Sequence, residues 1–215
     1  MLAPIDGARL LTLPTVEPLT LVEAKAHLRV DVTDDDALIT GLIIAARQYV
    51  EQRCWCALLN QTWIVGLETW PNDAPRLSML NPVLQLSSSR WAALRLPMTP
   101  LLMRPTITAV RYQKRAPSPV VLASTVYSIW PTGELALGYG QSWPGDLLPW
   151  SIEVEYVVGY GATAASVPAP LLAAVKLMLG HLYENREAVT VGAGVSTMVT
   201  PLAVDSLLAL YEVRG

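Results

Sequence analysis

The sequence predicts an α+β protein: a four-helix bundle formed by the N- and C-terminal segments, with an inserted antiparallel β domain. Three observations lead to this prediction. Apolar side chains recur at helical spacing in residues 19–54 and again in 168–211, whereas residues 61–160 hold short β-type runs between Pro and Gly. Hydrophobic residues make up 52% of the 215-residue chain, which is enough for one substantial core and a smaller satellite.

Capping signals predict the first two helices. Thr20 and Glu23 form a Thr-x-x-Glu capping box, so a helix begins after Thr20 and ends near Val30. Thr33, followed by three aspartates, predicts the start of a longer helix that ends near Cys54. The apolar stripe of this helix is wide, and its predicted solvent face carries Arg47, Gln48, Glu51 and Gln52.

The middle of the chain is predicted to be β structure. The clearest strand begins at Ile152, where strict alternation places Ile152, Val154 and Tyr156 on a core face and both intervening glutamates in water. A hairpin-like arm is expected at about 72–103. The other predicted strands are Thr62–Val65, Ile107–Tyr112, Tyr127–Trp130 and Glu134–Leu137.

Helical spacing returns at Pro168 and continues to about Arg186. Gly192 and Gly194 are predicted to form a hinge before a short final helix capped by Thr200. The apolar side of that helix is formed by Val204, Leu207, Leu208 and Tyr211. The predicted organisation is therefore a helical part in 1–58, a β domain with an extended arm in 59–163, and a helical part with a docking tail in 164–215.

Charge and composition exclude several classes of protein. The net charge is −3 and Lys and Arg are scattered, which disfavours tight nucleic-acid binding. No apolar run reaches the roughly 18–20 residues of a membrane span, and the N-terminus lacks a basic flank followed by an apolar stretch. Cys54 and Cys56, the only cysteines, predict free thiols and neither a disulfide framework nor a zinc site.

No catalytic, metal or cofactor site is predicted. Cys54 or Cys56 meeting His27 or His181 leaves a hydrolase as an alternative, but neither cysteine has the Gly-flanked setting of a nucleophile. The acids 34–36 fit capping better than magnesium binding. A glycan-binding module is another alternative, because five tryptophans could line a sugar platform: Trp63, Trp70, Trp130, Trp143 and Trp150.

Several runs of the sequence are similar to a known family. They are "EPLTLVEAKAHLRVD", "ALITGLIIAARQYVEQRCWCALLNQTW", "RPTITAVRY", "LGYGQSWP", "IEVEYVVGYGATAASVPAPLLAAVKLMLGHLYENREAV" and "PLAVDSLLALYEVR", in this order. The chain resembles the head-tail connector family of tailed phages, the adaptor or head-completion proteins, which is also found in gene transfer agents. The departure is the stretch 72–103, which looks longer than the usual link.

The resemblance implies a non-enzymatic virion protein of the neck, made in the host cytoplasm. It implies a homo-oligomeric ring, expected to have twelve subunits, that binds the portal protein above and a stopper or tail protein below. Double-stranded DNA would pass through the ring without sequence-specific binding. A stopper or tail-completion protein of the same neck is the alternative within this setting.

The last segment of the chain is expected to contact the portal. A pair of hinge glycines, a capped short helix and a terminal Arg make a segment able to order on a partner. The residues expected to bind the portal are Leu207, Tyr211, Val213 and Arg214.

Overall fold

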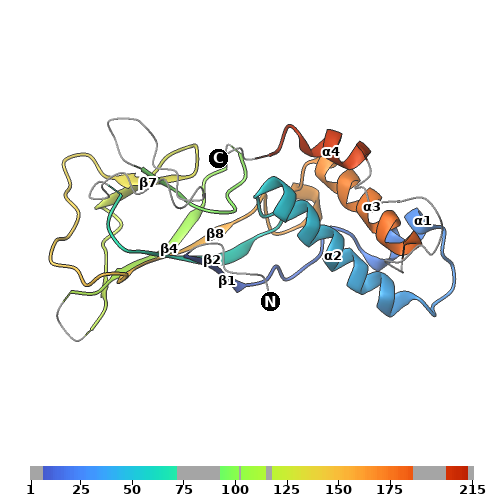
Figure 1. The fold of residues 1–215 in the computed structure, drawn as a ribbon, viewed down its shortest axis with the longest axis horizontal. Helices are drawn as coiled ribbons and strands as arrows, with labels where there is room; N and C mark the ends of the chain where they lie inside the picture. Colours follow the sequence, from blue (N-terminus) through green and yellow to red (C-terminus); the bar gives the residue numbers. More distant parts are fainter. Residues whose placement is uncertain (1–6, 72–92, 102, 115–117, 186–201, 213–215) are drawn as a thin grey trace, which may run out of the picture. The chain divides into compact units, whose positions relative to one another are not determined.

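The structure is a computed structural model that describes residues 7–71, 93–101, 103–114, 118–185 and 202–212. The chain divides into two compact units (Figure 1). The β unit contains the described residues of 1–13 and 60–159, and the helical unit contains those of 14–59 and 160–213. The α+β class with antiparallel sheets is thus confirmed.

The larger sheet of the β unit has five antiparallel strands in the order β1-β2-β8-β4-β5. They are β1 (Ala8–Thr12), β2 (Gln61–Leu67), β4 (Thr106–Tyr112), β5 (Val120–Val121) and β8 (Ile152–Val158). β8 lies in the centre, and its core face is as predicted, with Ile152, Val154 and Tyr156 fully buried. Glu153 is exposed as predicted, whereas Glu155 is half-buried and pairs with Arg111 at 2.7 Å. β1 is not predicted from the sequence, because its residues do not alternate between apolar and polar.

The smaller sheet has the order β3-β7-β6. Its strands are β3 (Ala93–Arg95), β6 (Tyr127–Ile129) and β7 (Glu134–Leu137). Residues 93–101 belong to the predicted arm, yet Leu94, Leu96 and Met98 are buried in the β unit. This end of the arm is therefore part of the core, and residues 72–92 lie outside the described residues. The Tyr156 hydroxyl joins the sheets by donating to the Pro97 carbonyl at 3.2 Å.

Helix α1 (Leu21–Leu28) begins at the predicted capping box. The Glu23 amide donates to the Thr20 hydroxyl at 3.2 Å, and the Thr20 amide donates to the Glu23 carboxylate at 2.9 Å. The hydrogen bonds from the Thr20 backbone and side chain lower the pKa of Glu23. Two donors at the helix start are thereby satisfied.

Replacing Thr20 by Ala is expected to lower the free energy of unfolding by about 1 kcal/mol, because the Glu23 amide loses its acceptor. Thr40→Ala in helix α2 is the matched control. The Thr40 hydroxyl only donates to the Asp36 carbonyl of its own helix, so its loss should change stability by less than about 0.5 kcal/mol. Urea unfolding followed by circular dichroism compares the two, and equal losses would contradict the capping role.

Helix α2 (Asp36–Cys54) begins three residues after the predicted cap. Thr33 contributes its backbone carbonyl, which accepts from the Asp36 amide at 3.1 Å, and Asp35 is the residue that precedes the first turn. The Asp35 carboxylate instead accepts from the Tyr183 hydroxyl at 2.5 Å. The predicted cap at Thr33 is therefore wrong: Asp35 is the N-cap residue, and its carboxylate bonds to Tyr183 and does not cap the helix.

Helices α3 (Ala169–Glu184) and α4 (Leu202–Leu208) follow the β unit in the chain, as predicted. All four helices contribute to one apolar core, with Ala24, Ile43, Leu171, Leu179 and Leu208 buried in it. Only α2, with 19 residues, and α3, with 16, are long; α1 has eight residues and α4 seven. The predicted four-helix bundle is thus not confirmed in that form, because two of its helices are only about two turns long.

Candidate functional site

The residues expected to bind a partner lie in part on the last described segment. Leu207 of α4 and Tyr211 beyond it are half-buried and pack against the helical core. Leu210 lies between them in sequence and is 84% exposed, which sequence reasoning missed because helical spacing places it off the apolar side. Val213, Arg214, Gly192 and Gly194 lie outside the described residues.

Helix α4 is attached to the end of α2 by ion pairs and by apolar burial. Arg53 contacts the Asp205 carboxylate, 3.4 Å from Nε, and also pairs with Glu212. Arg53 is 43% exposed, and surface pairs of this kind contribute about 0–1 kcal/mol. The fully buried Val204 and Leu208 therefore hold α4 more strongly than its charges do.

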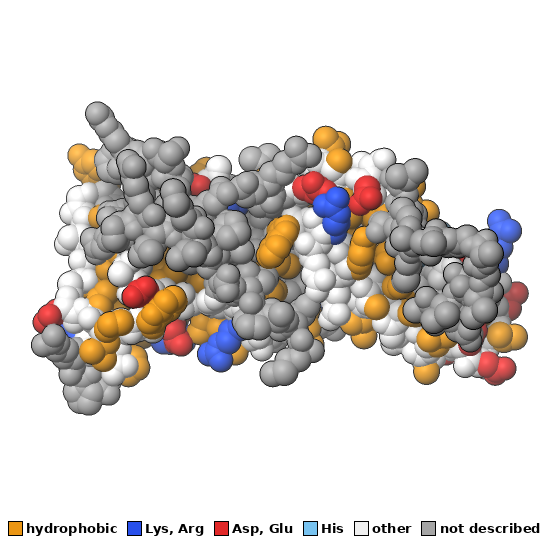
Figure 2. All heavy atoms as spheres, viewed as in Figure 1, with side chains coloured by type: hydrophobic (Ala, Val, Ile, Leu, Met, Phe, Trp, Pro, Cys, Tyr) orange, Lys and Arg blue, Asp and Glu red, His pale blue; other side chains and the backbone are white. Residues whose placement is uncertain are grey.

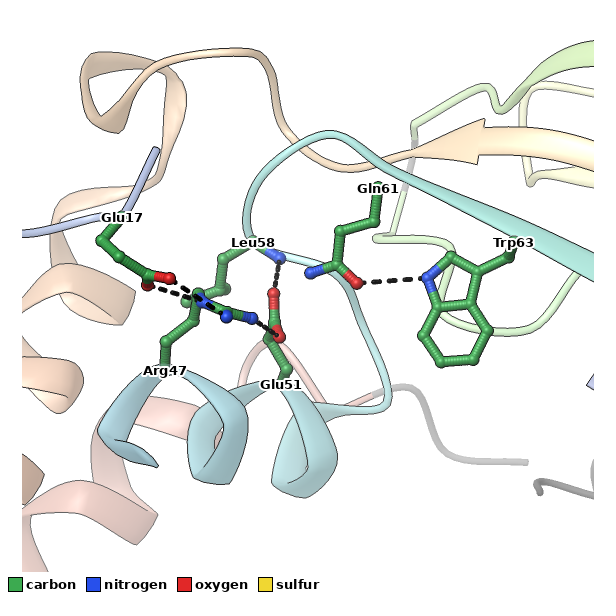
Figure 3. A network of polar contacts seen from close by, with 6 residues as sticks. All are labelled: Glu17, Arg47, Glu51, Leu58, Gln61 and Trp63. Atoms are coloured by element: carbon green, nitrogen blue, oxygen red, sulfur yellow. Dashed lines mark hydrogen bonds and ion pairs between the residues drawn. The ribbon is translucent and has the colours of Figure 1, made fainter. Parts of the chain in front are cut away.

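A buried polar network lies on α2 (Figure 3). Arg47 donates through Nη1 to Glu51 at 2.7 Å and through Nε to Glu17 at 2.7 Å. The second oxygen of Glu51 accepts from the Leu58 amide at 2.9 Å. Arg47 is 2% and Glu51 4% exposed, so the prediction that they cover the solvent face is wrong. Their burial is possible because each charge is paired within the network.

Burial and the neighbouring charges shift the pKa values of this network in opposite directions. Burial raises the pKa of the Glu51 carboxyl, and this effect outweighs the attraction of Arg47 and the hydrogen bond from Leu58. Burial alone would lower the pKa of Arg47, but the hydrogen bonds to the carboxylates of Glu17 and Glu51 and their charges raise it. The network therefore depends on Arg47 to compensate the buried carboxylate of Glu51 and the half-buried carboxylate of Glu17.

The network fastens segments that lie next to the boundaries of the helical unit. The unit begins at Pro14, and Glu17 follows three residues later. It is interrupted after Leu59 and resumes at Tyr160. The Leu58 amide is bound by Glu51, and the Leu58 carbonyl accepts from the Tyr160 amide at 3.3 Å. Segments far apart in the sequence are thus tied together inside the helical unit, around one buried ion pair.

The thiol and histidine side chains do not form the arrangement that a hydrolase needs. Cys54 and Cys56 are fully buried, so neither is accessible to a substrate. The hydrogen bond with Cys54 and burial raise the pKa of Cys56, which disfavours its thiolate. His27 lies on the exposed side of α1, and His181 is half-buried beside Asn185.

Two of the three acids 34–36 are engaged in structural contacts. Asp36 pairs with Lys25 at 2.6 Å, and Asp35 accepts from Tyr183. Among the described residues, no group of three or more His, Cys, Asp or Glu side chains could hold a metal ion. None of the helices in the described part of the chain is long and apolar enough to cross a membrane.

The tryptophans do not line a common exposed platform. Trp63 and Trp70 are buried in the β unit, and Trp143 stacks on Trp70 with ring centroids 4.5 Å apart. Trp150 is 65% exposed and lies in the segment between β7 and β8. A sugar platform needs several exposed ring faces, so this geometry does not favour the glycan-binding alternative.

Comparisons with a family model and with solved structures indicate the same class of protein. Residues 18–91 match the family model described as phage gp6-like head-tail connector protein. No curated protein sequence matches the chain. The chain is similar to a protein in the neck of an empty gene transfer agent particle computed with C6 symmetry, with 22% identity, 94% of this chain and 93% of that chain covered, and a TM-score of 0.69.

Two further solved structures have the same fold. A protein in the virion of a native gene transfer agent particle is 22% identical, with 95% of this chain and 94% of that chain covered and a TM-score of 0.69. One in the neck of a native particle computed with C12 symmetry is 22% identical, with 94% and 93% covered and a TM-score of 0.66. The fold is thus shared over almost the whole chain. The match over residues 18–91, which include α1 and α2, confirms the predicted resemblance to head-tail connector proteins in this part of the chain.

Proposed function

We propose that this chain is an adaptor ring subunit that joins the portal of a phage or gene transfer agent head to the stopper or tail. The observation that carries the proposal is the connector-family match, together with a fold shared with proteins of particle necks computed with C6 and C12 symmetry. The protein acts by assembly and not by catalysis. It belongs to the neck of the particle after assembly in the host cytoplasm.

The proposed ring contains twelve copies, with the helical unit as its wall and DNA passing through the centre. A closed ring of identical subunits needs two different contact surfaces on each copy. The chain has the apolar content for this, with 52% hydrophobic residues. Its net charge of −3 supports passage, because a lumen without a basic run does not hold the phosphates of sliding DNA.

The segment from Gly192 to Gly215 is proposed to dock on the portal. Leu207 and Tyr211 are only half-buried in the helical core, and Leu210 is exposed between them. Apolar side chains at the end of a chain can therefore be covered by a partner. Val213 and Arg214 extend the proposed contact.

Electron microscopy of the purified chain, alone and with portal, tests the proposal. Rings with a central hole and twelvefold symmetry are expected, and they should persist after Cys54→Ser and Cys56→Ser exchange. A chain that ends at residue 199 should lose portal binding, because the docking segment is missing. Absence of rings in both conditions would contradict the adaptor role, and binding to a tail protein without the portal would indicate a stopper.

A further inference from the structure

The charged side chains of α2 are all used inside the helical unit. Asp36 pairs with Lys25, Arg47 with Glu51 and Glu17, and Arg53 with Asp205 and Glu212. A surface helix normally carries charged residues on the face opposite the core. In α2 these charges face neighbouring segments of the same unit, which leaves the remaining surface of the helix uncharged.

That remaining surface is the α2 outer face, which consists of Ala37, Leu38, Thr40, Gly41, Ile44, Ala45 and Gln48. These residues are exposed, except for the half-buried Gln48, and at 3.6 residues per turn they lie on one side of the helix. None is charged. In Figure 2 the surface over α2 is mainly orange and white, and red and blue side chains gather towards its ends.

Gly41 gives a second, independent indication. It lies inside α2, where glycine lowers helix stability relative to alanine. A Cβ added at Gly41 would meet nothing within 4 Å, so no described neighbour in the chain requires the missing side chain. A glycine on the surface of a helix leaves room for another backbone or helix to approach closely, which accounts for its presence at such a position.

We propose that the α2 outer face is covered in the assembled ring by the helical unit of a neighbouring copy. This inference rests on the proposed ring. An uncharged surface fits an uncharged surface, since the centres of protein interfaces are depleted of charge. DNA does not fit this face, because no Lys or Arg lies on it to meet phosphates.

A second copy can supply the complementary surface. A cyclic ring joins two different surfaces of the same chain. The helical unit exposes apolar side chains on its other helices, with Val22 of α1 77% exposed and Leu177 of α3 37% exposed. Exposed apolar side chains outside the α2 outer face are therefore present on the same helical unit.

Two substitutions on the α2 outer face test the inference in the full-length chain. Ile44→Glu places a charge in the contact and should lower the fraction of assembled rings at least tenfold, while the unassembled subunit remains folded by circular dichroism. Gly41→Leu should raise the melting temperature of the unassembled subunit, because Leu is a better helix former and the space is open, and yet weaken ring assembly. Val121→Glu, at an exposed position of β5, is the matched control and should assemble normally.

A photoreactive benzoylphenylalanine at position 44 identifies the molecule that covers the α2 outer face. It should crosslink to a second copy of this chain, detected as a dimer by mass spectrometry, whereas the same group at position 121 serves as a control. Variants that assemble like the wild type, or a crosslink to portal or tail protein, would overturn this inference and leave the ring in place. A wild-type chain that forms no ring with or without portal would instead overturn the proposed function, and this inference with it.

Discussion

Arg47→Met is expected to lower the free energy of unfolding of the helical unit by about 3–5 kcal/mol. The substitution keeps most of the side-chain volume but removes the cation that compensates Glu51, which is 4% exposed, and Glu17. An uncompensated buried carboxylate costs much more than the pair itself contributes. Guanidinium unfolding followed by circular dichroism measures the loss, with amide hydrogen exchange of helical residues to assign it to this unit.

Arg53→Met on the same helix is the matched control. Arg53 is 43% exposed and its partners Asp205 and Glu212 keep contact with water, so a loss of less than about 1 kcal/mol is expected. The double variant Arg47→Met with Glu51→Gln should recover part of the stability, because Gln can still accept from the Leu58 amide without a charge. Equal losses for Arg47→Met and Arg53→Met would contradict the role given to the buried network.

The loss in Arg47→Met is expected to depend on pH. Burial already raises the pKa of Glu51, and removing Arg47 takes away the charge that opposes this effect. A folded pKa above the unfolded value means that the folded state binds protons more tightly. The variant is therefore closest to the wild type below the unfolded pKa of a glutamate, and its deficit grows as the pH rises through the folded pKa of Glu51. Melting temperatures from acidic to neutral pH measure this trend.

Local signals in the sequence predict much of this fold. The capping box at Thr20 is a local signal, since its two hydrogen bonds join residues three apart. The alternation in 152–156 identifies the central strand for the same reason, because a face buried in a sheet is visible within a few residues. Such elements can be predicted because the residues that determine them are close together in the sequence.

Features that depend on distant residues were not predicted. Arg47 looks like a solvent residue at helical spacing, and its burial depends on Glu17, thirty residues away, in addition to Glu51 on the same helix. β1 likewise depends on its pairing with β2, whose paired residues lie 50 to 57 positions later in the chain. The N-cap of α2 is Asp35 and not the expected Thr33, and the Asp35 carboxylate bonds to Tyr183 on α3. In each case a tertiary partner overrides the local preference.

The candidate site also has parts that local sequence signals predict and parts that depend on distant residues. Sequence reasoning selects the C-terminal segment from its local hinge, cap and helix signals, and the structure places Leu207 and Tyr211 at the edge of the helical core. The uncharged outer face of α2 is hidden in the sequence, because Asp36, Arg47, Glu51 and Arg53 make the helix look polar. Only their partners reveal that these charges are directed at the same unit.

Trp70→Ala is expected to lower the stability of the β unit by about 3–5 kcal/mol, because Trp70 is 1% exposed and makes three kinds of contact. Its ring stacks on Trp143 at 4.5 Å and meets Tyr112 edge-on at 6.0 Å. Its Nε1 donates to the Pro144 carbonyl at 2.8 Å. The substitution leaves a cavity and removes an attachment of the segment between β7 and β8, in which Leu148 donates to Gln113.

Trp150→Ala, in the same segment, is the matched control for this loss. Trp150 is 65% exposed, so its removal should change stability by less than about 0.5 kcal/mol. Amide hydrogen exchange at Leu148 should become faster in Trp70→Ala and stay unchanged in Trp150→Ala, since only Trp70 holds the neighbouring Pro144 carbonyl. Trp70→Phe should lose less stability than Trp70→Ala, because it keeps an aromatic ring in the stack while it removes the indole donor and part of the ring. Equal stability of Trp70→Ala and Trp150→Ala would show that the stack does not hold this segment.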